Sequence, residues 1–173
     1  MTASPPRKVL FVCTGNICRS PAAEVIATTL ARTLVDQQGR SLGDRYRFSS
    51  AGTASWHVGD DMDPRARLAL EEAGFDPPLH AARHATDQLL ADSHLVIALD
   101  RKHLEILKGR VRGTEEPPTL ALLRPFDPRH GGAHDVADPY YGGPEDFTRC
   151  VDVVSSATGG LLRALNDDEV FER

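Results

Sequence analysis

The sequence predicts an α/β protein in which four parallel strands form one doubly wound sheet with helices on both faces. Short, continuously apolar runs alternate with segments whose apolar residues recur at helical spacing, which is typical of a parallel sheet buried between helices. The chain has 173 residues, 40% of them hydrophobic, enough for one compact core. We therefore expect a single domain over residues 7–173, preceded by a disordered tail at residues 1–6.

The first strand is expected at residues 8–12, where a lysine precedes an apolar run. A helix should follow, because apolar residues recur at helical spacing at Ala22, Ile26, Leu30 and Leu34. Ser20 is a suitable N-cap for this helix, and Pro21 suits its first helical position. The segment between strand and helix, residues 13–19, is then a short loop at the carboxyl end of the strand.

The later elements follow the same alternation. Further strands are expected at residues 46–51, 95–99 and 120–123. Helices are expected from Asp63 to the stop signal at Gly74, around Leu104 and Leu107, and through Phe147, Val151, Val154 and Leu165. Gly159 and Gly160 should weaken the last helix. Residues 109–118 and 129–136 are expected to be exposed loops.

Composition excludes several classes of protein. The net charge of -5 argues against a nucleic-acid or anionic-membrane binder, which would carry a basic surface. No apolar stretch approaches the roughly 20 residues that span a bilayer, and the first residues do not resemble a signal peptide. Three irregularly spaced cysteines do not form a secreted disulfide framework. We expect a cytoplasmic protein with reduced thiols.

The loop after the first strand has the composition of an anion cradle. In a doubly wound fold, ligands bind beyond the carboxyl ends of the strands, and here the sequence CTGNICRS joins a strand to a helix N-terminus. Gly15 permits a positive φ, and Asn16 is among the few other residues that tolerate one. The backbone N–H groups of such a loop can surround a tetrahedral anion. The sequence therefore predicts a phosphate-binding loop between the first strand and the first helix.

Two side chains of this loop carry chemistry. Cys13, close to a guanidinium and a helix N-terminus, is expected to be a thiolate at neutral pH and to attack phosphorus. The planar fork of Arg19 can bind two equatorial phosphoryl oxygens, and Ser20 can hydrogen-bond the departing sulfur. Cys150, next to an inward-facing helix position, is interpreted as a small core residue. For Cys18 two interpretations stay open: a sulfur that pairs with Cys13, or a space-filling residue under the loop.

These residues also carry a family resemblance. VCTGNICRSP resembles the active-site loop of the low-molecular-weight protein tyrosine phosphatases, in which a cysteine, five residues and an arginine precede a serine or threonine. The resemblance continues in SAGTASWHVG (50–59), DPRA (63–66), HAAR (80–83), VIALD (96–100) and DPYYG (138–142). It spans nearly the whole chain in the family's order.

The resemblance implies roles for residues outside the loop. Asp138, in DPYY, matches the family's general acid, and one carboxyl can serve as acid and then as base. Trp56 and Tyr140 would form the walls of a slot deep enough for phosphotyrosine and too deep for phosphoserine. His57 and Tyr141 would contact the substrate around it. Asp100 is given a supporting role only.

The remaining site residues are those of the loop and its support. Substrate contacts are expected from Thr14, Gly15, Asn16, Ile17, Cys18 and Ser20. Ser50 and His80 match family positions that brace the loop through hydrogen bonds with Asn16. No histidine, cysteine or carboxylate cluster has the spacing of a metal site, and we expect neither metal nor cofactor.

The resemblance implies hydrolysis of phosphotyrosine in proteins through a phosphocysteine. Arsenate reductases share the loop but need further cysteines, and none lies between Cys18 and Cys150. Phosphoarginine phosphatases have threonine where this chain has Ile17, which suits an aryl ring better than a guanidinium. A non-catalytic phosphate-binding module is the third alternative. We expect a monomer acting on a phosphoprotein. A tyrosine kinase is one candidate for that phosphoprotein.

Overall fold

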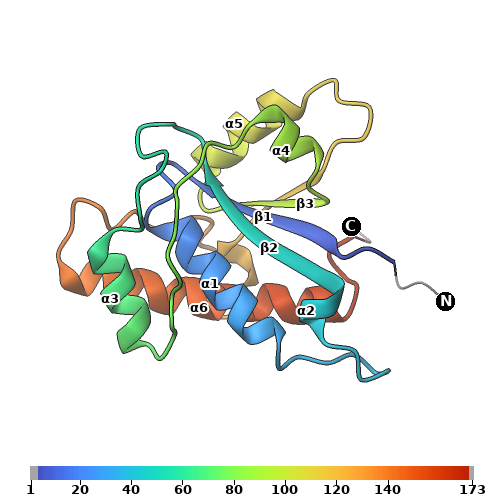
Figure 1. Ribbon diagram of the computed structural model, residues 1–173, viewed down its shortest axis with the longest axis horizontal. Helices are drawn as coiled ribbons and strands as arrows, with labels where there is room; N and C mark the ends of the chain where they lie inside the picture. Colours follow the sequence, from blue (N-terminus) through green and yellow to red (C-terminus); the bar gives the residue numbers. More distant parts are fainter. Residues whose placement is uncertain (1–3, 172–173) are drawn as a thin grey trace.

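A four-stranded parallel sheet forms the centre of the protein, which is described here over residues 4–171 by a computed structural model (Figure 1). The strands are β1 (Arg7–Cys13), β2 (Tyr46–Gly52), β3 (Leu95–Ala98) and β4 (Thr119–Leu122), in the order β2-β1-β3-β4. Each pair is parallel. The predicted sheet is confirmed, and each strand boundary differs from its predicted position by no more than one residue.

Helices cover both faces of the sheet (Figure 1). One face carries α1 (Arg19–Ala31), α2 (Leu42–Arg45), α3 (Pro64–Glu72) and α6 (Pro144–Asn166). The other face carries α4 (Asp87–Ala91) and α5 (Arg101–Val111), and a 3-10 turn, η1, spans Arg124–Phe126. No helix in the described part of the chain has the length and apolar character needed to cross a membrane.

The central strand β1 supplies both hydrophobic cores. Its side chains alternate between the two faces, so that Val9 and Phe11 join the larger core with α1, α3 and α6, whereas Leu10 and Val12 join a smaller core with α4 and α5. All four side chains are fully buried. Burial on both faces explains why the strand is continuously apolar rather than alternating.

Two short helices were not predicted. In α2, Ser41 accepts a hydrogen bond from the Gly43 N–H, and in α4, Thr86 accepts one from the Leu89 N–H. Helices of four and five residues are too short to show helical periodicity, so their caps are the only sequence signal.

Some predicted boundaries were wrong. The helix α1 ends at Ala31, before Leu34, and residues 109–111 form the last turn of α5 rather than an exposed loop. In the predicted exposed loop over residues 129–136, Val136 is buried. Its N–H donates a hydrogen bond to the Leu99 carbonyl. Of the predicted tail, residues 1–3 lie outside the described residues, and residues 4–6 have no regular structure.

Ser20 does not cap α1. The helix begins at Arg19, with Cys18 at the N-cap position and no side-chain cap bond, so that Pro21 lies at the third helical position. Pro21 is tolerated there because N–H groups of the first turn have no partner within the helix. The Ser20 side chain instead faces the loop that precedes the helix.

The helix α6 continues unbroken through Gly159 and Gly160. A Cβ built on Gly160 would overlap the Phe126 carbonyl oxygen of η1, whereas a Cβ on Gly159 would find only the flexible end of Arg163, at 3.6 Å. Gly160 is thus a point of close approach between α6 and η1, and its lack of a side chain allows this packing.

These two glycines make a matched pair. Gly160→Ala is expected to lower the free energy of unfolding by about 1–3 kcal/mol, because α6 must move away from η1. Gly159→Ala is expected to be neutral or to stabilise by up to about 1 kcal/mol, as alanine normally does in a helix. Urea unfolding of both variants measures the difference, and equal stabilities would disprove the close-packing argument.

Candidate active site

The predicted phosphate-binding loop lies at the carboxyl end of β1, where the sheet order reverses. The chain places β2 on one side of β1 and β3 on the other, and ligands bind at such points in doubly wound sheets. A cavity of about 380 Å³ opens there. It is lined by Cys13, Thr14, Gly15, Ile17, Cys18, Arg19, Trp56, His57, Asp138, Tyr140 and Tyr141, all of them predicted site residues.

Asn16 gives the loop its shape. Its φ is +58°, in the left-handed region, which asparagine tolerates better than most residues. Gly15, for which a positive φ was also predicted, does not have one. Its lack of a side chain serves a different purpose, because a Cβ there would lie 3.0 Å from Cδ2 of His57.

Buried hydrogen bonds hold Asn16 in this conformation. Its Nδ2 donates to Ser20 Oγ and Ser50 Oγ, both at 2.9 Å, and its Oδ1 accepts from the Arg83 N–H at 3.0 Å. His80 Nε2 donates to the Asn16 carbonyl at 2.7 Å. The structure therefore contains the bracing network predicted for Ser50 and His80. Asn16 and Ser20 are fully buried and do not line the cavity, so their side chains support the loop.

Sequence reasoning missed one further member of this network. Glu24, one turn after Ser20 in α1, accepts a hydrogen bond from Ser50 Oγ. A glutamate on a helix has no sequence signal of its own, since only the packing of α1 against β2 brings it to Ser50. The contact leaves Ser50 Oγ both donating and accepting, so its orientation is fixed.

Ser20 contacts the proposed nucleophile. Its Oγ is 3.0 Å from Cys13 Sγ. Asn16 donates to the same oxygen, so the one Ser20 proton has two acceptors, the Ala51 carbonyl at 3.4 Å and the nearer Cys13 sulfur. As a thiolate, the sulfur can only accept. Cys13 is 3% exposed and lies on the cavity wall, so the sulfur is shielded from bulk water but open to a bound group.

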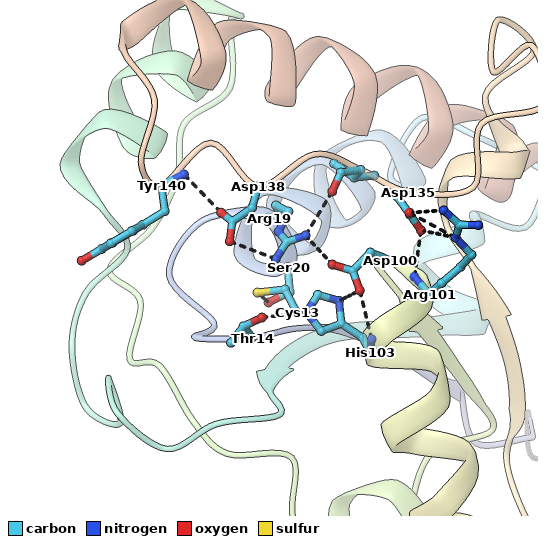
Figure 2. A network of polar contacts seen from close by, with 11 residues as sticks. Cys13, Thr14, Arg19, Ser20, Asp100, Arg101, His103, Asp135, Asp138 and Tyr140 are labelled. Carbon is cyan, nitrogen blue, oxygen red and sulfur yellow. Dashed lines mark hydrogen bonds and ion pairs between the residues drawn. The ribbon is translucent and has the colours of Figure 1, made fainter.

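Arg19 is a buried charge with three oxygen partners. It is 3% exposed; Nη1 donates to Asp100 Oδ2 at 2.9 Å and to the Val136 carbonyl at 3.0 Å, and Nη2 donates to Asp138 Oδ2 at 3.3 Å (Figure 2). Burial by itself would lower the pKa of Arg19, but Cys13, Asp138 and Asp100 outweigh it, and the pKa is raised. The guanidinium is therefore a permanent positive charge beside the sulfur.

Asp100 lies between Arg19 and His103 and contacts both (Figure 2). Asp100 caps α5 by accepting from the His103 N–H at 3.0 Å. Burial opposes ionisation of Asp100, but this bond, His103 and Arg19 together lower its pKa. His103, which sequence reasoning missed, is 2% exposed. Burial and then the charge of Arg19 lower its pKa to about 4, so the imidazole is neutral at physiological pH.

Asp138 lies on the loop between β4 and α6, with its carboxylate on the cavity and 47% exposed. Its Oδ1 accepts from the Tyr140 N–H at 3.1 Å, which fixes the carboxylate on its own loop (Figure 2). The loop is anchored upstream, where Val136 N–H donates to the Leu99 carbonyl at 2.9 Å. Arg101 adds a bidentate ion pair to Asp135, another contact that the sequence did not predict.

Aromatic side chains surround the cavity mouth. Tyr140 and Tyr141 pack edge to face, with ring centroids 4.9 Å apart, and the His57 ring lies 6.4 Å from that of Tyr140. Trp56 and Tyr141 are 78% and 96% exposed. Arg65, held by Asp63, lies 5.6 Å from the Tyr140 ring and supports it from behind. The site thus has a charged floor and an aromatic rim.

All three cysteines are free thiols. Burial is the main cause that raises the pKa of Cys18, and burial likewise raises the pKa of Cys150 to about 12. Cys150 lies in the core on α6, as predicted. Cys18, near the end of the loop, lines the cavity. Over residues 4–171, no group of three or more His, Cys, Asp or Glu side chains is arranged to hold a metal ion.

Comparison with known proteins identifies the family. Residues 8–170 match the family model described as low molecular weight phosphotyrosine protein phosphatase. The chain belongs to this family. It is 46% identical over 159 residues to low molecular weight protein-tyrosine phosphatase A of Mycobacterium tuberculosis, with 91% of each chain covered. It is 41% identical over 161 residues to the low molecular weight protein-tyrosine-phosphatase of Streptomyces coelicolor, covering 92% of this chain and 94% of the relative.

A solved phosphatase structure has the same fold. The protein tyrosine phosphatase of Entamoeba histolytica, crystallised with Hepes in its active site, superposes with a TM-score of 0.83 at 29% identity, covering 94% of this chain and 99% of that one. The family resemblance inferred from the loop and five further segments is therefore confirmed over nearly the whole chain.

Proposed function

We propose that this phosphatase-family chain hydrolyses phosphotyrosine in proteins through a phosphocysteine intermediate, with Cys13 as nucleophile, Arg19 as phosphate clamp and Asp138 as general acid and base. The observation that carries the proposal is the convergence of these three side chains on one cavity. A non-catalytic phosphate-binding module would need neither a nucleophile nor a proton donor, so the convergence argues against that alternative.

In the first step, the Cys13 thiolate attacks phosphorus in line with the tyrosyl oxygen. An S–P bond forms as the P–O bond to tyrosine breaks. The Arg19 fork holds equatorial phosphoryl oxygens while charge redistributes among them. Asp138 donates its proton to the tyrosyl oxygen, which leaves as a neutral phenol. The contact between Arg19 and Asp138 supports this geometry, because it keeps the carboxyl at the edge of the phosphate site.

In the second step, water attacks phosphorus from the side that tyrosine has left. Asp138, now a carboxylate, takes a proton from this water, and the S–P bond breaks. The electron pair of that bond returns to the sulfur, so that Cys13 is again a thiolate and inorganic phosphate is released. Ser20 Oγ, at 3.0 Å from Sγ, can donate its hydrogen bond to the sulfur as the charge returns. Water is the only co-reactant.

The lining of the cavity supports an aryl phosphate as substrate. Trp56, Tyr140 and Tyr141 offer aromatic surface to a phenyl ring, and Ile17 adds an apolar side chain to the wall. A phosphoarginine side chain would place a polar guanidinium against this surface. Ile17 offers that guanidinium no hydrogen-bonding side chain. Phosphoarginine hydrolysis is therefore not favoured.

Partner, assembly and compartment belong to the same proposal. The substrate is a phosphoprotein, for which a tyrosine kinase is one candidate. Every group used in the two steps comes from one chain, which supports action as a monomer. A reactive thiol beside a second free thiol, Cys18, requires a reducing compartment, which supports a cytoplasmic location.

A panel of phosphopeptides tests the substrate class. The wild-type protein is expected to hydrolyse a phosphotyrosine peptide at least about a hundredfold faster, by kcat/KM, than phosphoserine or phosphoarginine peptides of the same sequence, because only the aryl ester reaches the loop floor along the aromatic walls. Cys13→Ser should abolish turnover but retain oxyanion binding. Preference for phosphoarginine, or turnover by Cys13→Ser, would refute the proposal.

A leaving-group series tests Asp138. In Asp138→Asn, kcat should fall by about 10²–10⁴-fold for aryl phosphates with poor leaving groups, because these depend on proton donation. Esters of acidic phenols, which leave without a proton, should lose much less at the step of P–O cleavage. Single-turnover rates of phenol release across the series measure this. Equal slowing for good and poor leaving groups would remove Asp138 from the acid role.

A further inference from the structure

A chain of polar contacts joins the two ends of the phosphate-binding loop from outside (Figure 2). Thr14, directly after the nucleophile, has its Oγ1 2.8 Å from Nε2 of His103. The other ring nitrogen, Nδ1, is 3.1 Å from Asp100 Oδ1. Asp100 Oδ2 accepts from Arg19 at 2.9 Å. Thr14 at one end of the loop and Arg19 at the other are therefore connected through His103 and Asp100, which both lie at the start of α5.

The charges in this chain fix which ring nitrogen of His103 carries the proton. A carboxylate can only accept hydrogen bonds, so the proton belongs on Nδ1, facing Asp100. This contact is not aligned as a hydrogen bond, and no other group within residues 4–171 accepts from the buried Nδ1. The low pKa of His103 keeps Nε2 unprotonated, and Nε2 therefore accepts from the Thr14 hydroxyl. The Thr14 side chain is held in one orientation as a donor.

We propose that His103 is a positioning residue of the phosphatase reaction, an imidazole that bridges the Thr14 side chain and Asp100 and so fixes the start of the loop around Cys13 relative to Arg19. This inference rests on the proposed function and goes beyond it, because His103 does not line the cavity and is 2% exposed. It acts on the reacting groups only through Thr14 and Asp100.

The position of Thr14 explains why such a support matters. The Thr14 backbone is held on one side by the segment that follows β2, where its carbonyl accepts from the Ala54 N–H at 3.0 Å. Its side chain points the other way, to α5. His103 thus adds the second anchor of the residue that follows the nucleophile. Small displacements of such groups weaken transition-state binding strongly.

The first arm of the test measures inorganic phosphate binding by calorimetry, together with kcat and KM for an aryl phosphate. His103→Leu removes both contacts and keeps apolar bulk. Thr14→Val removes only the hydroxyl and keeps the shape of the side chain. Each should raise the phosphate Kd and lower kcat/KM by about tenfold, the effect of one well-placed hydrogen bond. The double variant should be no worse than His103→Leu alone, because the contact that Thr14→Val removes is already lost in His103→Leu.

The second arm separates positioning from packing. His103→Gln can return a hydrogen-bonding atom near the place of Nε2 and should recover a large part of the lost phosphate affinity. The control is His94→Gln, at the opposite end of β3, where the ring accepts from the Lys8 N–H. It should leave phosphate Kd and kcat/KM unchanged.

Each outcome decides the proposal. If His103→Leu and Thr14→Val lower the melting temperature but keep phosphate Kd and kcat/KM within twofold of wild type, His103 is a packing residue and the proposal is wrong. Additive losses in the double variant would also refute it. If His103→Leu does not fold, Thr14→Val alone decides. Failure of the proposed function would look different: the wild-type protein would not hydrolyse phosphotyrosine at all, and the phosphate Kd would still report on positioning.

Discussion

The buried positive charge of Arg19 is the constraint on which the site depends. A guanidinium that is 3% exposed is stable only if oxygens surround it, because an unpaired buried charge is strongly destabilising. The oxygens come from Asp100 after β3, the Val136 carbonyl, and Asp138 before α6. One charge therefore contacts segments that lie 81 to 119 residues further along the chain. The same pairing that stabilises the fold brings the proton donor to the thiol.

The parallel sheet makes this convergence possible. The carboxyl ends of β1 and β3 are neighbours, so the loop that leaves β1 with Cys13 and the residue that leaves β3, Asp100, meet at one edge of the sheet. The left-handed Asn16 then turns the loop back toward α1, and its cost in backbone energy is met by hydrogen bonds to Ser20, Ser50 and Arg83. Packing and catalysis share these contacts.

Much of the fold and of the cavity lining could be predicted from the sequence, because both leave local signals. Continuous apolar runs marked the strands, and the spacing from Cys13 to Arg19 marked the loop. What could not be predicted depends on tertiary contacts. Nothing in the sequence distinguishes His103 from other histidines, because it contacts Thr14 only through the packing of α5 beside the loop. Glu24 likewise contacts Ser50 only because α1 packs against β2. The prediction of Ser20 as an N-cap was wrong for the same reason: Ser20 lies within the first turn of α1, and its hydroxyl contacts the Cys13 sulfur instead of the helix backbone.

The most direct test of the role of Arg19 is the dissociation constant of inorganic phosphate, measured by calorimetry for the wild-type protein and for Arg19→Lys. Lysine keeps the positive charge but has no planar fork, so it cannot hold Asp100, the Val136 carbonyl and a phosphoryl oxygen together. We expect phosphate to bind at least about a hundredfold more weakly to a folded Arg19→Lys protein. Binding within threefold of wild type would contradict the account, because charge alone would then suffice.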